Sequence, residues 1–158
     1  MTQTPVQSYR DLRVWQEGIS FAKKVYKVSQ VFPPQERFGL ISQMRRAAIS
    51  IPSNIAEGHA RIGTREYLHF LSIAMGSVAE LDTQIILCRE LEFLSPQDSQ
   101  EMIRQLETIG KMLRRLYQAL DSPRVGDSTN QAVPFESELA LSEEQETWDI
   151  GTPRARTL

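Results

Sequence analysis

The histidines are the first residues to consider for chemistry, because the sequence contains only two, His59 and His69. Glu66 precedes His69 with the Glu-x-x-His spacing that helical bundles use in sites for two metal ions. Such sites need this motif twice, together with further inward carboxylates, and the sequence contains the motif once. We therefore expect no metal ion and no other cofactor.

The single cysteine, Cys88, is a second candidate for chemistry. It lies in an apolar helical stripe without an evident histidine partner, so a buried small hydrophobe is favoured over a nucleophile. One cysteine also excludes an intramolecular disulfide, which fits a reducing cytoplasm. Phosphate-binding glycine loops, Ser-His-Asp arrangements and paired catalytic acids are missing as well. The sequence therefore predicts a cytoplasmic protein that is not an enzyme.

A group of polar residues occurs where two expected helices should be apolar. Small neighbouring residues would let these helices approach closely, so that the polar side chains hydrogen-bond between them, with an arginine as cationic partner. A buried cluster of this kind fixes register rather than adding net stability, and a ligand pocket is the alternative. Its members are Arg46, Ser50, Asn54, Glu57, Ser77 and Glu80.

The basic residues are unevenly distributed along the chain. Residues 1–120 contain 15 Lys and Arg against 12 Asp and Glu, whereas residues 121–158 contain 3 against 8. Clustered cations can neutralise the phosphates of a nucleic acid, although a solvated surface would show the same pattern. The candidate phosphate contacts are Lys23, Lys24, Arg45, Arg61, Arg65, Arg104, Lys111, Arg114 and Arg115.

The spacing of apolar residues predicts four helices, over residues 9–31, 35–58, 65–92 and 96–120, and these helices carry the candidate residues. The first has two apolar stripes, one through Ile19 and Tyr26 and one through Phe21 and Val25. Pro52 should bend the second helix or, alternatively, break it. Short connections require consecutive helices to double back. The predicted fold is an all-α, antiparallel up-down-up-down four-helix bundle over residues 9–121, between a flexible N-terminus (1–8) and an acidic, disordered tail (122–158).

The starts of the helices also carry signals in the sequence. Thr64 is a suitable N-cap for the third helix, and Ser95 followed by Pro96 marks the start of the fourth. The N-terminus is polar and no apolar run approaches the roughly 20 residues that span a bilayer, so we expect neither a signal peptide nor a membrane partner.

Five runs of sequence carry a resemblance to a known family, and they occupy residues 11–16, 38–40, 43–58, 66–71 and 74–81. Over residues 9–120 the chain resembles the 23S rRNA-intervening sequence protein family, also called the four-helix-bundle protein family. The resemblance implies that the subunits assemble into a closed ring, typically a homopentamer. It also implies a bacterial protein. The family is similar in architecture to the accessory protein of diversity-generating retroelements, a basic pentamer that binds nucleic acid and a reverse transcriptase.

Two functional hypotheses follow from the charge pattern and the resemblance. The first is a non-catalytic, oligomeric protein that binds nucleic acid, structured RNA or else DNA, through its basic clusters. The second is a protein-interaction scaffold, such as a retroelement accessory-like protein, in which the acidic tail regulates access or covers the basic surface.

Overall fold

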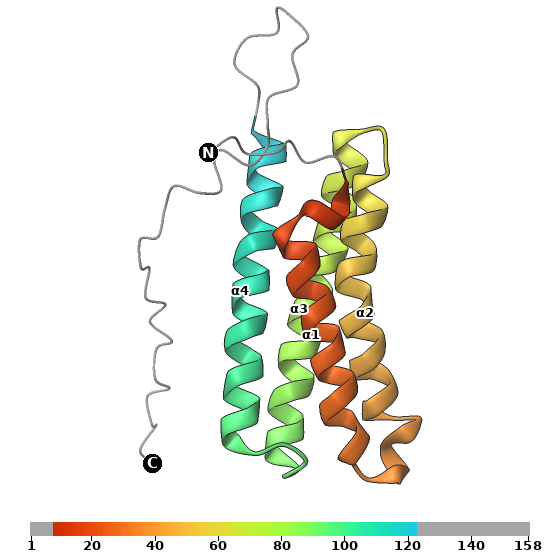
Figure 1. Ribbon diagram of the computed structural model, residues 1–158, viewed down its shortest axis with the longest axis vertical. Helices are drawn as coiled ribbons and strands as arrows, with labels where there is room; N and C mark the ends of the chain where they lie inside the picture. Colours follow the sequence, from red (N-terminus) through yellow and green to blue (C-terminus); the bar gives the residue numbers. More distant parts are fainter. Residues whose placement is uncertain (1–7, 123–158) are drawn as a thin grey trace, which may run out of the picture.

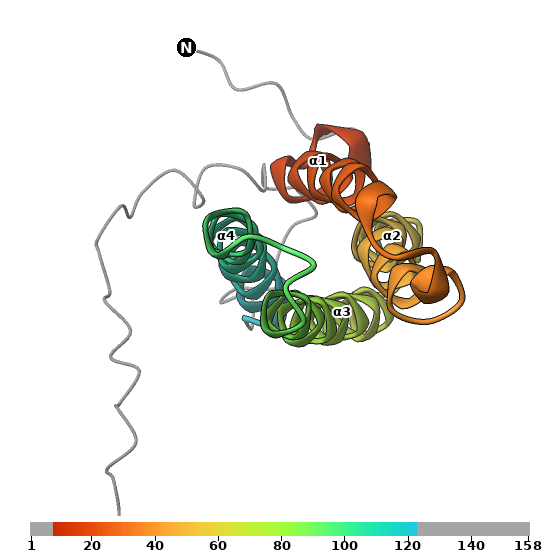
Figure 2. The same cartoon turned by 90° about the horizontal axis from the view of Figure 1, so that it is seen from below.

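The computed structural model describes residues 8–122 of the chain. The expected flexible N-terminus and the expected disordered tail lie outside the described residues. The described part forms four long helices, α1 (Arg13–Val28), α2 (Leu40–His59), α3 (Thr64–Glu90) and α4 (Pro96–Asp121). They run alternately down and up (Figure 1), and they follow one another in chain order around the bundle axis (Figure 2). The predicted all-α, antiparallel four-helix bundle is confirmed.

Short 3₁₀ turns flank α1 and precede α2, over Tyr9–Asp11, Ser29–Val31 and Pro34–Arg37. The predicted first and second helices were therefore too long at these ends. The late start of α2 is due to Gly39, its N-cap residue, whose backbone (φ −99°, ψ −117°) is not helical and separates the 3₁₀ turn from the helix. Pro52, by contrast, lies inside a continuous α2, so the helix does not break there.

The cap of α4 is as predicted, and the cap of α3 is not. The Ser95 hydroxyl accepts a hydrogen bond from the backbone N–H of Asp98 at 3.0 Å, which satisfies one of the free amides of the first turn. In α3 the N-cap residue is Gly63, and Thr64 is already helical without a side-chain cap.

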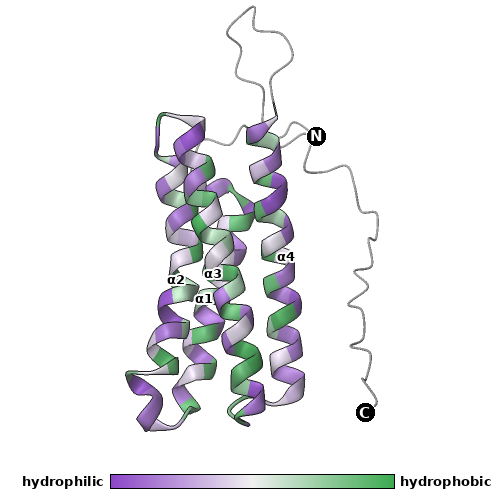
Figure 3. Cartoon of the chain, turned by 180° about the vertical axis from the view of Figure 1, so that it is seen from behind, coloured by the Kyte–Doolittle hydropathy of each residue, from purple (hydrophilic) through white to green (hydrophobic). Residues whose placement is uncertain are grey.

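The core lies between all four helices, and α2 and α3 share the most extensive contact. Met44, Ile51 and Ile55 of α2 and Leu81 and Ile85 of α3 are fully buried. Figure 3 shows hydrophobic residues recurring between hydrophilic ones along each helix. By length and composition alone α3 is apolar enough to cross a membrane, but its buried stripe here packs against α2 and α4. The apolar spacing of α3 is therefore that of a core helix.

The structure decides between the two apolar stripes of α1. Phe21 and Val25 are fully buried, whereas Ile19 is 44% exposed and Tyr26 is 41% exposed. The stripe that contains Phe21 faces the core, and the stripe that contains Ile19 and Tyr26 lies about a quarter turn away. That second stripe borders α2 at the surface, where Tyr26 contacts Arg45.

Candidate nucleic-acid interface

The α1 and α4 cations gather on one side of the bundle. The Lys24 Nζ atom lies 2.5 Å from the Glu101 Oε1 atom, and this ion pair joins α1 to α4. Arg13 and Glu17 precede Lys24 by eleven and seven residues, so all three share the flank of α1 that faces α4. Lys23 and Lys27 lie on the outer side of the same helix and are exposed. The lysine cluster of α1 thus borders the basic helix α4.

Three cations of α4 form an exposed line next to these lysines. Arg104, Lys111 and Arg115 are seven and four residues apart, which places them within about 40° of one another around the helix. At a rise of about 1.5 Å per residue they span roughly 16 Å along the axis. That length is enough to meet several phosphates of one nucleic-acid strand.

We call this surface the α1–α4 face. Seven cations lie on it against three carboxylates, and one of the carboxylates is already engaged by Lys24. The excess of cations over carboxylates on this small surface is therefore larger than the excess over residues 1–120 together, which contain 15 Lys and Arg and 12 Asp and Glu. Its members are Arg13, Glu17, Lys23, Lys24, Lys27, Asp98, Glu101, Arg104, Lys111 and Arg115.

Arg114 does not belong to the α1–α4 face, although it is adjacent to Arg115 in sequence. Its Nη2 atom lies 3.5 Å from the position that a Cβ atom on Gly110 would occupy, and Val78 of α3 lies 3.6 Å from the same position. Arg114 therefore lies on the α3 side of α4.

Arg61 and Arg65 lie at the end of the bundle where α2 connects to α3. Arg61 forms an ion pair with Glu57, and its guanidinium carbon lies 4.9 Å from the centroid of the Phe70 ring. Together with His69 and Glu66, these arginines line an open depression of about 460 Å³. The carboxylates offset much of their charge, so this end is less suited to phosphate than the α1–α4 face.

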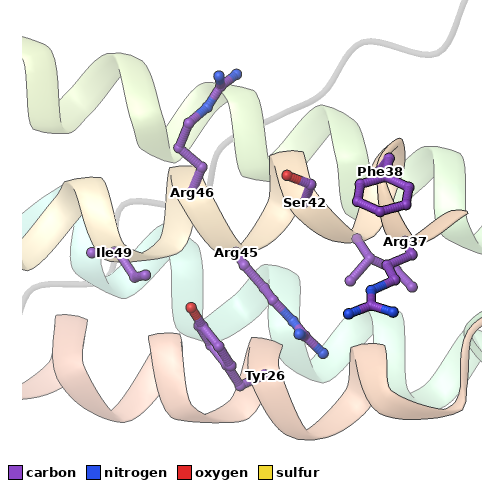
Figure 4. A pocket seen from close by; sticks show the side chains of 8 residues that line it. Tyr26, Arg37, Phe38, Ser42, Arg45, Arg46 and Ile49 are labelled. Carbon is purple, nitrogen blue, oxygen red and sulfur yellow. The ribbon is translucent and has the colours of Figure 1, made fainter.

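Arg45 lies on a different side again, in an open groove between α1 and α2 (Figure 4). Its Nε atom donates a hydrogen bond to the Ser29 hydroxyl at 2.9 Å, and its guanidinium carbon lies 4.7 Å from the centroid of the Tyr26 ring. We call this site the α1–α2 groove. Its volume is about 490 Å³, and it is lined by Tyr26, Arg37, Phe38, Ile41, Ser42, Arg45, Arg46 and Ile49.

Sequence reasoning missed the α1–α2 groove. Arg37, Tyr26 and Phe38 were not among the candidate binding residues. The sequence did contain a signal for it, which is the stripe of α1 through Ile19 and Tyr26. The two apolar stripes of α1 are too far apart around the helix for both to face one core. An aromatic residue such as Tyr26 in the stripe that does not face the core indicates a surface contact or a binding site.

The structure brings together only part of the predicted polar cluster. The Ser77 hydroxyl donates to the Ser50 hydroxyl at 2.8 Å, which links α3 to α2. The Asn54 amide donates to the hydroxyl and to the backbone carbonyl of Ser50, at 2.9 and 2.7 Å. These three residues form a small hydrogen-bonded group at the contact between the helices.

The other three predicted members lie elsewhere. Glu57 pairs with Arg61, and the exposed Glu80 accepts a hydrogen bond from the Gln84 amide at 3.0 Å. Arg46 is exposed, and Figure 4 shows it pointing in the opposite direction from Arg45. All three are exposed, and Glu57 and Glu80 bond to residues four positions away in the sequence, so the six residues do not make one buried cluster.

Of the residues considered first for chemistry, Cys88 and His59 occupy packing positions, whereas His69 is exposed in the depression beside Arg61 and Arg65. The Cys88 thiol is buried 3.4 Å from the Met44 sulfur, and burial, with a smaller contribution from the Glu36 carboxylate, raises the pKa of the thiol to about 11. The His59 ring makes edge contacts with the rings of Tyr9 and Tyr67. Within residues 8–122, no three His, Cys, Asp or Glu side chains gather as metal ligands would.

These observations define an antiparallel four-helix bundle with one basic face and an arginine-rich groove. Residues 10–115 match the family model described as 23S rRNA-intervening sequence protein. The chain belongs to that family.

The fold is shared with a solved structure. The chain is similar to a protein of unknown function from the S23 ribosomal protein family of Bacteroides thetaiotaomicron, with a TM-score of 0.62 and 20% identity. The similarity covers 66% of this chain and 98% of that one. Comparison with curated proteins gives no match.

Proposed function

We propose that this protein is a non-catalytic nucleic-acid-binding protein that contacts phosphates through the α1–α4 face, with structured RNA as the favoured ligand. The observation that carries the proposal is the excess of seven cations over three carboxylates on that face. Lys23, Lys27, Arg104 and Lys111 form no ion pair within the described residues, so their charges remain available to a ligand.

The mode of recognition would be contact with phosphates and with the shape of the ligand. The α1–α4 face consists of long basic side chains on two rigid helices, without an aromatic platform on which bases could stack. Proteins that recognise double-stranded RNA use the same combination of phosphate contacts and shape. The family description, which refers to an intervening sequence of 23S rRNA, supports RNA over DNA.

Assembly into a homo-oligomer, a pentamer by family resemblance, is the second part of the proposal. Apolar side chains outside the core support it, because a monomer rarely exposes so many of them on its helices. A closed ring would repeat the α1–α4 face in each subunit and raise the avidity for a long or folded RNA. Light scattering coupled to size exclusion would count the subunits. The exposed residues outside the α1–α2 groove are Ile19, Ile73, Ile86, Leu87 and Leu91.

The test is a salt series of binding affinities for the full-length protein with hairpin RNA, duplex RNA and duplex DNA, measured by fluorescence anisotropy. Replacing Lys23, Arg104 and Lys111 by glutamine should weaken binding. It should also flatten the slope of log affinity against log salt by about 2 to 3, since each phosphate contact contributes roughly 0.7 to 0.9.

A matched control variant removes the same charge elsewhere. Replacing Arg61, Arg65 and Arg89 by glutamine should leave most of the slope unchanged, because these residues lie off the α1–α4 face and two of them pair with carboxylates. Equal losses in the two variants would mean that net charge alone attracts the nucleic acid. No binding of any probe at low salt would refute the proposal.

A protein-interaction scaffold is the alternative, and the exposed apolar residues of α3 favour it. Ile73, Leu87 and Leu91 lie on the outer side of that helix, away from the cations. A protein that assembles normally, binds no nucleic acid and loses a protein partner when Leu87 and Leu91 are replaced by serine would support this alternative.

A further inference from the structure

The α1–α2 groove combines positive charge with exposed apolar surface. Three of its eight lining residues are arginines, and none is acidic. Phe38 is 89% exposed, and Tyr26 and Ile49 are each exposed by more than 40%. A surface with both properties suits a segment in which carboxylates alternate with hydrophobic side chains, because each kind of group finds its counterpart.

The arginine at the centre of the groove is held in place before any ligand arrives. The Ser29 hydroxyl accepts from the Arg45 Nε atom, and the same hydroxyl donates to the Tyr26 carbonyl at 3.2 Å. The Tyr26 ring supports the guanidinium from one side. The terminal nitrogens of Arg45 make no ion pair within the described residues, so a fixed, planar donor pair is presented to the groove. Such a fork matches a carboxylate in two-point contact.

One segment of this chain has the complementary composition. Between Arg124 and Arg154 the sequence contains no lysine or arginine. Residues 135–150 contain five large hydrophobic residues interspersed with six carboxylates. These are Phe135, Glu136, Glu138, Leu139, Leu141, Glu143, Glu144, Glu146, Trp148, Asp149 and Ile150.

The length of chain beyond α4 allows this segment to reach the groove. The C-terminal ends of α2 and α4 lie at the same end of the bundle (Figure 1). Arg45 lies fourteen residues before the end of α2, which is about 21 Å along the axis. Crossing the bundle adds roughly 20 Å, since neighbouring helices lie about 10 Å apart. The thirteen peptide bonds from Ser122 to Phe135 span up to about 43 Å when the chain is extended.

We propose that the acidic segment 135–150 of the same chain docks in the α1–α2 groove, with its carboxylates on Arg37 and Arg45 and its hydrophobic residues against Tyr26, Phe38 and Ile49. The proposal concerns a different face from the α1–α4 face and stands independently of nucleic-acid binding. A nucleic acid is the less suitable occupant, because phosphates would leave the apolar side chains of the groove in water.

Trp148 provides the test, since the chain has one other tryptophan, Trp15. In the full-length protein with Trp15→Phe, the emission of Trp148 should be blue-shifted and protected from acrylamide quenching. Both effects should disappear when Arg37 and Arg45 are replaced by glutamine, and both should weaken as salt screens the charge pairs. Replacing Glu143, Glu144 and Glu146 by glutamine should have the same effect from the side of the tail.

The matched control replaces Lys27 and Arg104 by glutamine, which removes equal charge from the α1–α4 face. It should leave the shielding of Trp148 unchanged, and circular dichroism should show the same helix content in all variants. Trp148 as accessible as in the urea-unfolded chain would overturn the proposal. So would shielding that survives the groove substitutions, or a groove variant that loses nucleic-acid affinity while Trp148 is exposed throughout.

Discussion

Replacing Gly58 by alanine tests the contact between α2 and α3 at its tightest point. A Cβ atom on Gly58 would lie 2.5 Å from Cδ2 of Tyr67 and 2.9 Å from Cβ of Phe70. The Phe70 Cβ atom is bound directly to the α3 backbone and cannot swing away. The Tyr67 ring is also confined, because its hydroxyl end is buried and the ring packs against the His59 ring. The added methyl group must therefore push the two helices apart.

The expected cost follows from two opposing effects. Overpacking of a rigid contact costs about 1 to 3 kcal/mol, and the backbone atom at Phe70 points to the upper part of that range. Alanine regains about 0.5 to 1 kcal/mol of helix propensity over glycine, with less near the end of a helix. We expect Gly58→Ala to lower the free energy of unfolding by about 1 to 2 kcal/mol.

Gly76→Ala is the matched control in the neighbouring helix. Gly76 lies in the middle of α3, and no heavy atom lies within 4 Å of where its Cβ would be. The same substitution should therefore raise the free energy of unfolding by about 0.5 to 1 kcal/mol. Urea unfolding at one fixed protein concentration, followed by far-ultraviolet circular dichroism, measures both. If Gly58→Ala is stabilising too, the close approach of α2 and α3 at Gly58 is wrong.

Three further predictions concern the caps, the helix contact and the thiol. Ser95→Ala should destabilise the protein by about 1 kcal/mol in urea unfolding, because the first turn of α4 loses its side-chain cap. Ser77→Ala should cost about 0.5 to 1.5 kcal/mol in the same assay, since Ser50 loses one of its partners. Burial raises the Cys88 pKa from 9.0 to about 11, so stability present below pH 9 should be lost as the pH rises through this interval. That loss should be smaller in Cys88→Ala, and unfolding measured at pH 8 and pH 11 compares the two.

The bundle and most of its core could be predicted from the sequence. The stripes of α2, α3 and α4 each offer one continuous apolar face, so the choice of the inward side is unambiguous. Met44, Leu81 and Leu113 are accordingly buried as their spacing predicts. Ser95 could be identified as a cap because capping depends on residues within one turn of each other.

The choice between the two stripes of α1 depends on information that is not local. Both stripes have helical spacing, and both contain aromatic residues. Phe21 faces the core and Tyr26 does not, because of the angle at which α1 packs between α2 and α4. The partners of surface side chains could not be predicted from the sequence either, because they too depend on how the helices pack. The positions of Lys24 beside Glu101 and of Arg45 beside Tyr26 depend on which helices become neighbours and at what height.

The sequence that identifies the family explains the bundle and leaves the binding surface open. In the run from Ser50 to Gly58, Ile51 and Ile55 fill the core, and Asn54 holds Ser50 at the contact with α3. Pro52 is buried against Gly18 of α1, and Gly58 admits the ring of Tyr67.

The cations of the α1–α4 face and the three arginines of the α1–α2 groove all lie outside this run. Exposed side chains can change at little cost to folding, whereas the residues of this run cannot. Proteins with the same run can therefore share the bundle and still differ in what they bind. The charge of the α1–α4 face, rather than family membership, is the property from which nucleic-acid binding by this protein has to be argued.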